Sequence, residues 1–226
     1  MTLNPKQRVA IHAANLVEKD MIVGLGTGST ANFFIEAIAK RNKAEKLNIR
    51  VVSSSIISAS IAKEAGLNVI ALSDIDNLDI YVDGADEVAS DLTLLKGRGQ
   101  DLVKEKLLAS AADQFFVLVD ETKLVENIGQ NFSIPVEVIP EAWQLVLAQL
   151  KLHGGHGQLR LNSSSDNVAF TASGSLVLDM TFGKMESLEL TMILDTIPGV
   201  IEHGIFSDLA TAVFIGTETA VEEHWY

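Results

Sequence analysis

Cysteine is missing from all 226 residues of the sequence, which excludes disulfide bonds, thiolate metal sites and cysteine nucleophiles. Basic residues are few, since 17 Lys and Arg stand against 30 Asp and Glu and give a formal net charge of −13. This net negative charge disfavours binding to nucleic acid or to an anionic membrane surface, because both would repel the protein. We therefore expect neither as a partner. An anionic small molecule would need a local cluster of cations and hydrogen-bond donors.

Long apolar runs are absent as well. No stretch is long enough to span a bilayer, and residues 1–6 lack the apolar core of a signal peptide. These two features predict a cytoplasmic protein. The 47% share of apolar residues and the length favour a folded main domain with a smaller companion domain.

Strands and helices are expected to alternate over residues 1–131. Asn4 before Pro5 is typical of a helix start, and this helix is expected to run to about Lys19. Strands are predicted at 21–25, 48–53, 67–72, 78–82 and 115–119. One helix is expected to begin at the glycine-rich turn 24–30, and two more are expected at 56–65 and 102–112. This alternation predicts an α/β fold, a parallel sheet with helices on both faces.

The pattern changes after Pro135. Helices are expected at 141–152 and 186–195, with short strands between them at 158–161, 167–171 and 176–180. Their spacing is that of antiparallel hairpins, which predicts a small α+β domain over 132–205. The strand at 212–215 is expected to rejoin the first sheet, so that 206–226 return to the main domain.

The first motif that indicates chemistry is Gly24-Leu-Gly-Thr-Gly-Ser-Thr30, between a predicted strand and a predicted helix. Glycines let backbone N–H groups approach a ligand, and Thr27, Ser29 and Thr30 add hydroxyl donors for phosphate oxygens. A dinucleotide fingerprint is the rival interpretation, but it requires glycine where Ser29 stands. An ordinary capped turn is the other alternative, and the three hydroxyls favour a phosphate-ester site over it.

The second motif, Tyr81-Val-Asp-Gly-Ala-Asp-Glu87, ends an apolar strand. Ligands of open parallel sheets bind beyond the carboxyl ends of the strands, where this motif is expected. A solvated acidic turn and a divalent metal site are alternatives, although no histidine lies near in sequence. We favour a site in which Asp83 and Asp86 accept hydrogen bonds from sugar hydroxyls.

The third motif is Lys96-Gly-Arg-Gly99, followed by a helix on which Glu105 shares a stripe with Leu102, Leu108 and Ala109. Burial among apolar neighbours raises the pKa of a carboxylate and suits it to accept a proton, unless Lys96 offsets the shift. A surface glutamate paired with a neighbouring lysine is the alternative. Lys123 and Lys6 are candidates for neutralising a phosphate, although either one alone is typical of a surface lysine.

The segments GLGTGSTA, YVDGADE, LLKGRGQDLVKEKLLASAA, LVDETKLV and IPVEVIP, in this order, resemble ribose-5-phosphate isomerase of the A type. The resemblance covers nearly the whole chain. It implies a Rossmann-like main domain, a small α+β (ferredoxin-like) domain, a homodimer or homotetramer, a sugar-phosphate substrate, and no metal or organic cofactor. It also implies that Glu105 accepts the proton, with Asp83, Asp86 and Lys96 as further catalytic residues. The substrate-binding residues that it implies are Lys6, Thr27, Gly28, Ser29, Thr30, Gly84, Ala85, Gly97, Arg98, Gly99 and Lys123.

Arg98 departs from the family pattern, in which three glycines usually follow the lysine. Either its side chain points away from the sugar, or it adds a cation that changes the substrate preference. The expected reaction interconverts ribose 5-phosphate and ribulose 5-phosphate through an enediolate. A related sugar-phosphate isomerase, a non-catalytic sugar-phosphate sensor and a nicotinamide-dependent oxidoreductase remain alternatives.

Overall fold

The computed structural model describes residues 3–226, and their contacts divide the chain into two compact units. The first unit comprises the chain up to Ala85, Lys104–Leu124 and Asp208–Tyr226. The second comprises Asp86–Val103 and Val125–Ser207. This division differs from the predicted boundaries at 131/132 and 205/206, because 86–103, 125–131 and 206–207 lie in the second unit.

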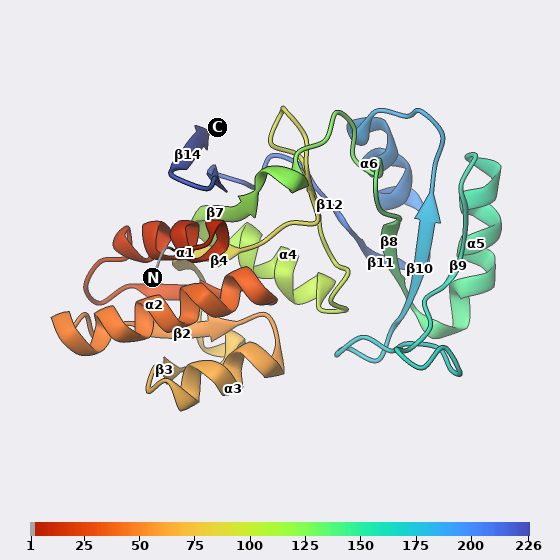
Figure 1. Cartoon of the computed structure of the whole chain (residues 1–226). Helices are drawn as coiled ribbons and strands as arrows, with labels where there is room; N and C mark the ends of the chain where they lie inside the picture. Colours follow the sequence, from red (N-terminus) through yellow and green to blue (C-terminus); the bar gives the residue numbers. More distant parts are fainter. Residues whose placement is uncertain (1–2) are drawn as a thin grey trace. The chain divides into compact units, whose positions relative to one another are not determined.

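The first unit is built on a seven-stranded sheet with the order β14-β13-β7-β4-β1-β2-β3 (Figure 1). Neighbouring strands are parallel except for the terminal pair β13 and β14, which is antiparallel. The strands are β1 (Ile22–Leu25), β2 (Arg50–Ser53), β3 (Asn68–Val69), β4 (Leu78–Asp83), β7 (Ala112–Asp120), β13 (Ala212–Gly216) and β14 (Val221–Trp225). The predicted parallel sheet and the return of the last predicted strand to it are confirmed.

The helices of this unit are α1 (Pro5–Asn15), α2 (Ser29–Glu45), α3 (Ile56–Glu64) and α4 (Leu102–Ala111), and α4 begins in the second unit and continues into the first. The side chain of Asn4 accepts a hydrogen bond from the Gln7 N–H at 2.8 Å, which completes the predicted N-cap. The predicted end of α1 near Lys19 is wrong. The guanidinium of Arg41 in α2 donates to the carbonyls of Ala14 and Val17, which satisfies the last turn of a shorter helix.

Helices cover both faces of this sheet. Helix α2 connects β1 to β2 and α4 connects β4 to β7, two steps in opposite directions along the sheet. Because such crossovers are right-handed, α2 and α4 lie on opposite faces. The strand residues alternate accordingly: Ile80 and Val82 belong to the core beneath α1 and α2, so Tyr81 and Asp83 point to the face of α4.

The second unit contains a four-stranded antiparallel sheet with the order β11-β8-β10-β9. The elements follow one another as β8 (Ile134–Val138), α5 (Trp143–Leu152), β9 (His156–Leu159), β10 (Leu176–Thr181), α6 (Ser187–Thr196) and β11 (Val200–His203). This order is the ferredoxin-like arrangement, as expected. The predicted strand at 167–171 is wrong, because that segment forms only isolated bridges at Val168 and Phe170.

A third, three-stranded sheet of the second unit has the order β12-β6-β5. Its strands β5 (Glu87–Val88), β6 (Leu94–Leu95) and β12 (Ile205–Phe206) are two residues long, too short for a periodic sequence signal. Short 3₁₀ turns occur at η1 (Leu72–Asp74), η2 (Glu121–Lys123) and η3 (Pro140–Ala142). The strand predicted at 67–72 covers only β3 (Asn68–Val69), and η1 begins at its last predicted residue. No helix within residues 3–226 is both long and apolar enough to cross a bilayer.

Candidate active site

The glycine-rich turn joins β1 to α2 and lies at the N-terminus of a helix of 17 residues. Gly28 is the N-cap and has φ +105°, a conformation that side chains with a Cβ rarely adopt. Lys6 of α1 donates from Nζ to Oγ of Ser29 at 3.2 Å. The turn therefore combines the positive end of the α2 dipole with a lysine ammonium, a combination that attracts an anion.

Asp83 at the end of β4 is held by three hydrogen bonds and is 1% exposed. Its Oδ1 accepts from the N–H groups of Thr27 at 3.1 Å and of Gly84 at 2.7 Å. Its Oδ2 accepts from the hydroxyl of Tyr81 at 2.6 Å. The carboxylate is thereby fixed in orientation and joined to the glycine-rich turn.

Tyr81 is fully buried two residues before Asp83, on the same face of the sheet. Burial, together with the negative charges of Asp83 and Glu105, raises the pKa of the Tyr81 phenol well above its usual value, and a hydrogen bond with Ser54 opposes the shift. The phenol therefore keeps its proton at neutral pH and remains a donor to Asp83. The hydroxyls of Thr27 and Ser54 also lie 3.0 Å apart, so this polar group reaches back to the turn.

Glu105 lies in the first turn of α4 and is 4% exposed. Leu102, Leu108 and Ala109 are buried with it, so the predicted apolar stripe is confirmed and a surface position for this carboxylate is excluded. Its negative charge contributes to the raised pKa of the Tyr81 phenol, so the two groups interact electrostatically. The first unit thus presents Asp83 and Glu105 on the same side of the sheet.

Asp86 and the loop 96–99 belong to the second unit. The N–H of Asp86 donates to the carbonyl of Leu95 at 2.8 Å. Leu95 directly precedes Lys96, so this bond holds Asp86 close to the loop. Lys96 is 3% exposed, its N–H donates to the Gly204 carbonyl at 2.8 Å, and its Nζ lies 5.7 Å from the ring centroid of Phe206. A buried ammonium over an aromatic ring is a cation–π contact, which holds the charge at the end of the side chain in place.

The guanidinium of Arg98 lies over the ring of Phe132, with Cζ 4.1 Å from the ring centroid. Its Nη1 also lies 3.8 Å from Oδ1 of Asp86, and its side chain is about half exposed. These contacts with Phe132 and Asp86, both in the same unit, favour the first interpretation of Arg98, in which its side chain points away from the sugar.

Replacing Arg98 with alanine is therefore expected to have a small effect on catalysis. We expect kcat/KM for ribose 5-phosphate to change less than about fivefold, and the free energy of unfolding to fall by about 1 kcal/mol through the lost cation–π contact and weak ion pair. Steady-state kinetics and urea unfolding measure the two effects, and Arg98→Lys serves as the charge-retaining control. A tenfold or larger rise in KM would show instead that the guanidinium contacts the substrate.

Glu87, the third acidic residue of the second motif, has a structural role. Its side chain is buried, and its two oxygens accept from the N–H groups of Gly129 at 2.6 Å, Asn131 at 2.5 Å and Phe132 at 3.0 Å. This carboxylate fixes the loop that carries Phe132. The interpretation of the motif as a solvated acidic turn is wrong, because Asp83 and Glu87 are both buried and hydrogen-bonded.

The structure assembles the predicted residues as two sets. The first unit brings Lys6 to Ser29 and Asp83 to Thr27 and Gly84, and the second brings Arg98 to Asp86. Lys123 ends η2, directly after β7, and is half-buried. Within residues 3–226, no group of three or more His, Asp and Glu side chains is arranged to hold a metal ion.

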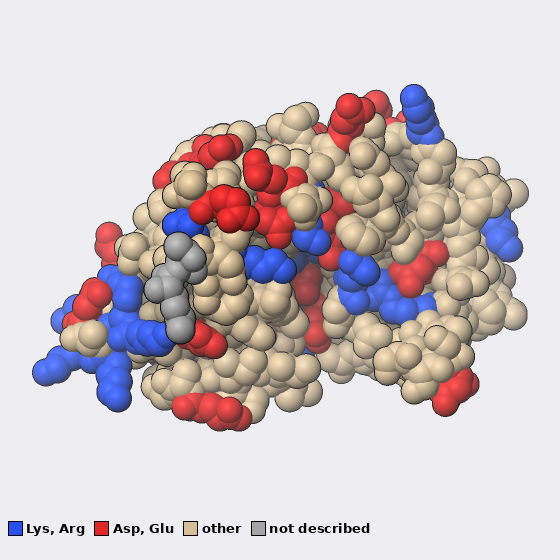
Figure 2. All heavy atoms as spheres, in the orientation of Figure 1, with Lys and Arg blue, Asp and Glu red and all other residues tan. Residues whose placement is uncertain are grey.

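Basic side chains also gather away from the turn. Figure 2 shows blue side chains over the end of the first unit at which α2 ends, where the sequence carries Lys40, Arg41, Lys43 and Lys46. A helix of 17 residues is about 25 Å long, so this group and the turn at Ser29 lie at opposite ends of α2. It does not contribute to the anion-attracting turn.

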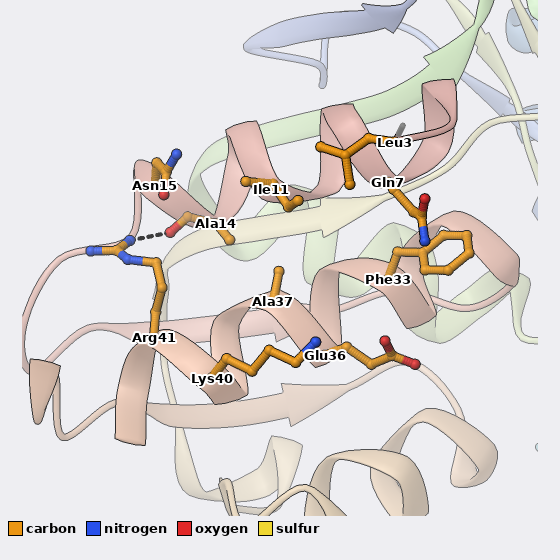
Figure 3. Close-up of a pocket in the computed structure, with 10 residues that line it drawn as sticks. All are labelled: Leu3, Gln7, Ile11, Ala14, Asn15, Phe33, Glu36, Ala37, Lys40 and Arg41. Atoms are coloured by element: carbon orange, nitrogen blue, oxygen red, sulfur yellow. Dashed lines mark hydrogen bonds between the residues drawn. The ribbon is translucent and has the colours of Figure 1, made fainter. Parts of the chain in front are cut away.

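An open groove of about 250 Å³ lies between α1 and α2 (Figure 3). It contains none of the predicted site residues. Its lining residues are Leu3, Gln7, Ile11, Ala14, Asn15, Phe33, Glu36, Ala37, Lys40 and Arg41.

Sequence reasoning missed three side chains that support the site. Tyr81 stands in the quoted motif, and its spacing of two from Asp83 in a strand was the available signal. Phe206, which lies under Lys96, and Arg160, which donates to the carbonyls of Gly97 and Arg98, are far along the chain from these contacts, and no local pattern connects them.

The chain matches the family model of ribose 5-phosphate isomerase A (phosphoriboisomerase A) over residues 50–220. It is 42% identical over 219 residues to ribose-5-phosphate isomerase A of Thermococcus kodakarensis, covering 96% of each chain. It is 41% identical to the protein of the same name from Thermosynechococcus vestitus, covering 93% of this chain and 90% of the relative.

Two solved structures resemble the fold closely. Ribose 5-phosphate isomerase A of Methanocaldococcus jannaschii has a TM-score of 0.93 and 36% identity, covering 98% of both chains. A D-ribose-5-phosphate isomerase solved in complex with phospho-erythronic acid has a TM-score of 0.93 and 38% identity, covering 98% of this chain and 97% of the other.

Proposed function

The chain belongs to the ribose 5-phosphate isomerase A family, and from this premise we propose roles for its own residues in the reaction. It is an aldose–ketose isomerase that interconverts D-ribose 5-phosphate and D-ribulose 5-phosphate. The observation that carries the assignment of residues is the buried Glu105 carboxylate on the same side of the sheet as Asp83.

The phosphate is assigned to the turn at the N-terminus of α2. Ser29 and Thr30 supply hydroxyls and N–H groups, Gly28 gives the backbone its conformation, and Lys6 and Lys123 neutralise charge. The contact between Lys6 Nζ and Ser29 Oγ supports this role for Lys6. A local cluster of this kind answers the problem that a chain of net charge −13 poses for an anionic substrate.

The hydroxyls of the open-chain sugar are assigned to Asp83 and Asp86. An aldose ring must open before the carbonyl reacts, and carboxylates that accept hydroxyl hydrogens assist this step. Asp83 suits the role because Thr27, Tyr81 and Gly84 hold its carboxylate rigid, so little orientational freedom is lost when substrate binds. The backbone of Gly84 and Ala85 and of the loop 97–99 completes the assigned contacts.

Proton transfer is assigned to Glu105. Its carboxylate removes the proton from C2, the electron pair moves through C1 to the carbonyl oxygen, and an enediolate forms. Glu105 then returns the proton to C1, and the proton of the C2 hydroxyl ends on O1, so atoms and charge balance. One carboxylate must reach two adjacent carbons, which requires accurate positioning of the sugar.

Lys96 is assigned to the oxygen that becomes negative. Its ammonium is buried, and electrostatic stabilisation of an oxyanion is strongest where water is excluded. The phospho-erythronic acid in the related structure supports an enediolate, because its carboxylate places two oxygens in one plane, as the enediolate does.

The test is an isomerase assay with ribose 5-phosphate in the presence and absence of EDTA. We expect ribulose 5-phosphate to form at the same rate in both, because no assigned step uses a metal. Running the reaction in D₂O should place deuterium at C1 of the ketose whenever the proton on Glu105 exchanges with solvent. A rate abolished by EDTA and restored by a divalent metal would contradict the proposed mechanism.

The homo-oligomeric state and the cytoplasmic location stay predictions. Light scattering of the purified protein measures the first, and fractionation of the native cells measures the second.

A further inference from the structure

Arg160 directly follows β9 and is locked to Asp179 of β10. Its Nε donates to Oδ2 of Asp179 at 2.9 Å and its Nη2 to Oδ1 at 2.5 Å, a bidentate pair with the arginine side chain 11% exposed. The backbone is fixed too, because the N–H of Arg160 donates to the Val177 carbonyl at 2.8 Å. Because the guanidinium is planar and Asp179 binds it through Nε and Nη2, the direction in which Nη1 donates is fixed.

That remaining donor contacts the glycine-rich loop. Nη1 of Arg160 lies 2.9 Å from the carbonyl oxygen of Gly97 and 3.3 Å from that of Arg98. Two successive carbonyls therefore point at one cation. Gly97 makes this possible with φ +92°, and a Cβ at Gly97 would collide with Leu102 and Pro135.

The direction of the carbonyls determines the direction of the neighbouring amides. In a trans peptide the N–H points opposite to the C=O of the same unit, so the N–H groups of Arg98 and Gly99 point away from Arg160. Two successive N–H groups on one side of a loop form a concave donor pair that binds anionic oxygen. Space on this part of the loop is open, because a Cβ built at Gly99 meets nothing within 4 Å.

We propose that Arg160, oriented by Asp179, is a positioning residue for isomerisation. By holding the carbonyls of Gly97 and Arg98, it turns the next two amides toward the oxygen of the sugar that becomes negative. This inference rests on the proposed function, in which the loop 96–99 binds substrate. It gives Arg160 and Asp179, which belong to none of the sequence motifs, a part in the chemistry.

The chain offers a matched control in Arg41, which makes the same contacts elsewhere. Arg41 forms a fork with Glu45, at 2.9 and 2.6 Å, and its Nη1 donates to the carbonyls of Ala14 and Val17. Figure 3 shows the contact with Ala14. Arg41 belongs to the groove between α1 and α2 and to no assigned catalytic contact. Replacing either arginine removes a bidentate ion pair and two hydrogen bonds to carbonyls. Of the two arginines, only Arg160 contacts the loop 96–99.

The experiment compares Arg160→Met with Arg41→Met by steady-state kinetics with ribose 5-phosphate, by inhibition with phospho-erythronic acid and by thermal unfolding. For Arg160→Met we expect kcat to fall about 10- to 100-fold while KM stays within about threefold, because misplaced oxyanion donors affect the transition state most. The inhibition constant should rise with the loss in kcat/KM, since the inhibitor carries a planar carboxylate. Guanidinium added to Arg160→Ala should restore part of the rate. Arg41→Met should keep both kinetic constants within about twofold.

Equal kinetic effects of the two substitutions, or a normal kcat for a folded Arg160→Met, would overturn the proposal. If Arg160→Met does not fold, Arg160→Lys is measured instead. Lysine keeps the charge but cannot form the bidentate pair, so its kcat should also fall, and a normal kcat would overturn the proposal. A wild-type chain without isomerase activity would overturn the proposed function first, and the assay reports this before any variant is compared.

Discussion

Glu105→Gln is expected to lose at least about 10²- to 10⁴-fold in kcat, the usual contribution of a positioned general base. The amide has nearly the shape of the carboxylate but cannot accept the C2 proton. Because Glu105 is buried at the start of α4, a replacement of equal size is needed there, and glutamine should leave the fold intact because it adds no bulk and opens no cavity. Steady-state kinetics should show the loss in kcat, and thermal stabilisation by ribose 5-phosphate should show that the sugar still binds.

Glu189→Gln is the matched control, because Glu189 also lies in the first turn of a helix, α6, but is exposed. Its kcat should stay within about twofold of wild type. Solvent deuterium should no longer enter the product with Glu105→Gln. A Glu105→Gln protein that turns over ribose 5-phosphate normally would remove this residue from the mechanism.

Gly26→Ala should nearly abolish activity without touching the substrate directly. A Cβ at Gly26 would overlap with Oδ1 and Cγ of Asp83, so the carboxylate must leave its position between Thr27 and Tyr81. A displacement of about 1 Å in a catalytic group costs on the order of 100-fold in rate, and we expect kcat/KM to fall by at least that factor. Overpacking should also lower the free energy of unfolding by about 1–3 kcal/mol.

Gly183→Ala provides the control for the loss of a glycine. A Cβ at Gly183 meets nothing within 4 Å, and its φ lies outside the left-handed region. This variant should match wild type in kcat/KM and in urea unfolding. If Gly26→Ala behaved in the same way, the orientation of Asp83 would have no part in catalysis.

The parallel sheet could be predicted because its strands are continuous apolar runs between helices of ordinary length. The run 78–82 and the run 115–119 both became central strands, β4 and β7, and β7 extends several residues beyond its prediction. The end of α1 could not be predicted, because the contact that terminates it comes from Arg41 in the next helix. The two-residue strands of the third sheet carry no period at all.

The candidate site was predictable where a motif is compact in sequence. Glu105 was found by its spacing from Leu102 and Leu108, which is a local property of a helix. The opposite case is Glu87, whose buried role depends on N–H groups more than 40 residues further along the chain. Side chains that position others, such as Arg160, are likewise determined by tertiary contacts and leave no local pattern.

The first unit is assembled from three separate segments, which has a consequence for the newly made chain. On one side β7 pairs with β4, but on the other side it pairs with β13, which begins about 90 residues after β7 ends. At about 5–20 residues per second, a ribosome needs roughly 5–20 s to deliver that last partner. During this interval the apolar edge of β7 is unpaired and can join another nascent chain. Synthesis speed over the second unit therefore sets how long each molecule is exposed to aggregation.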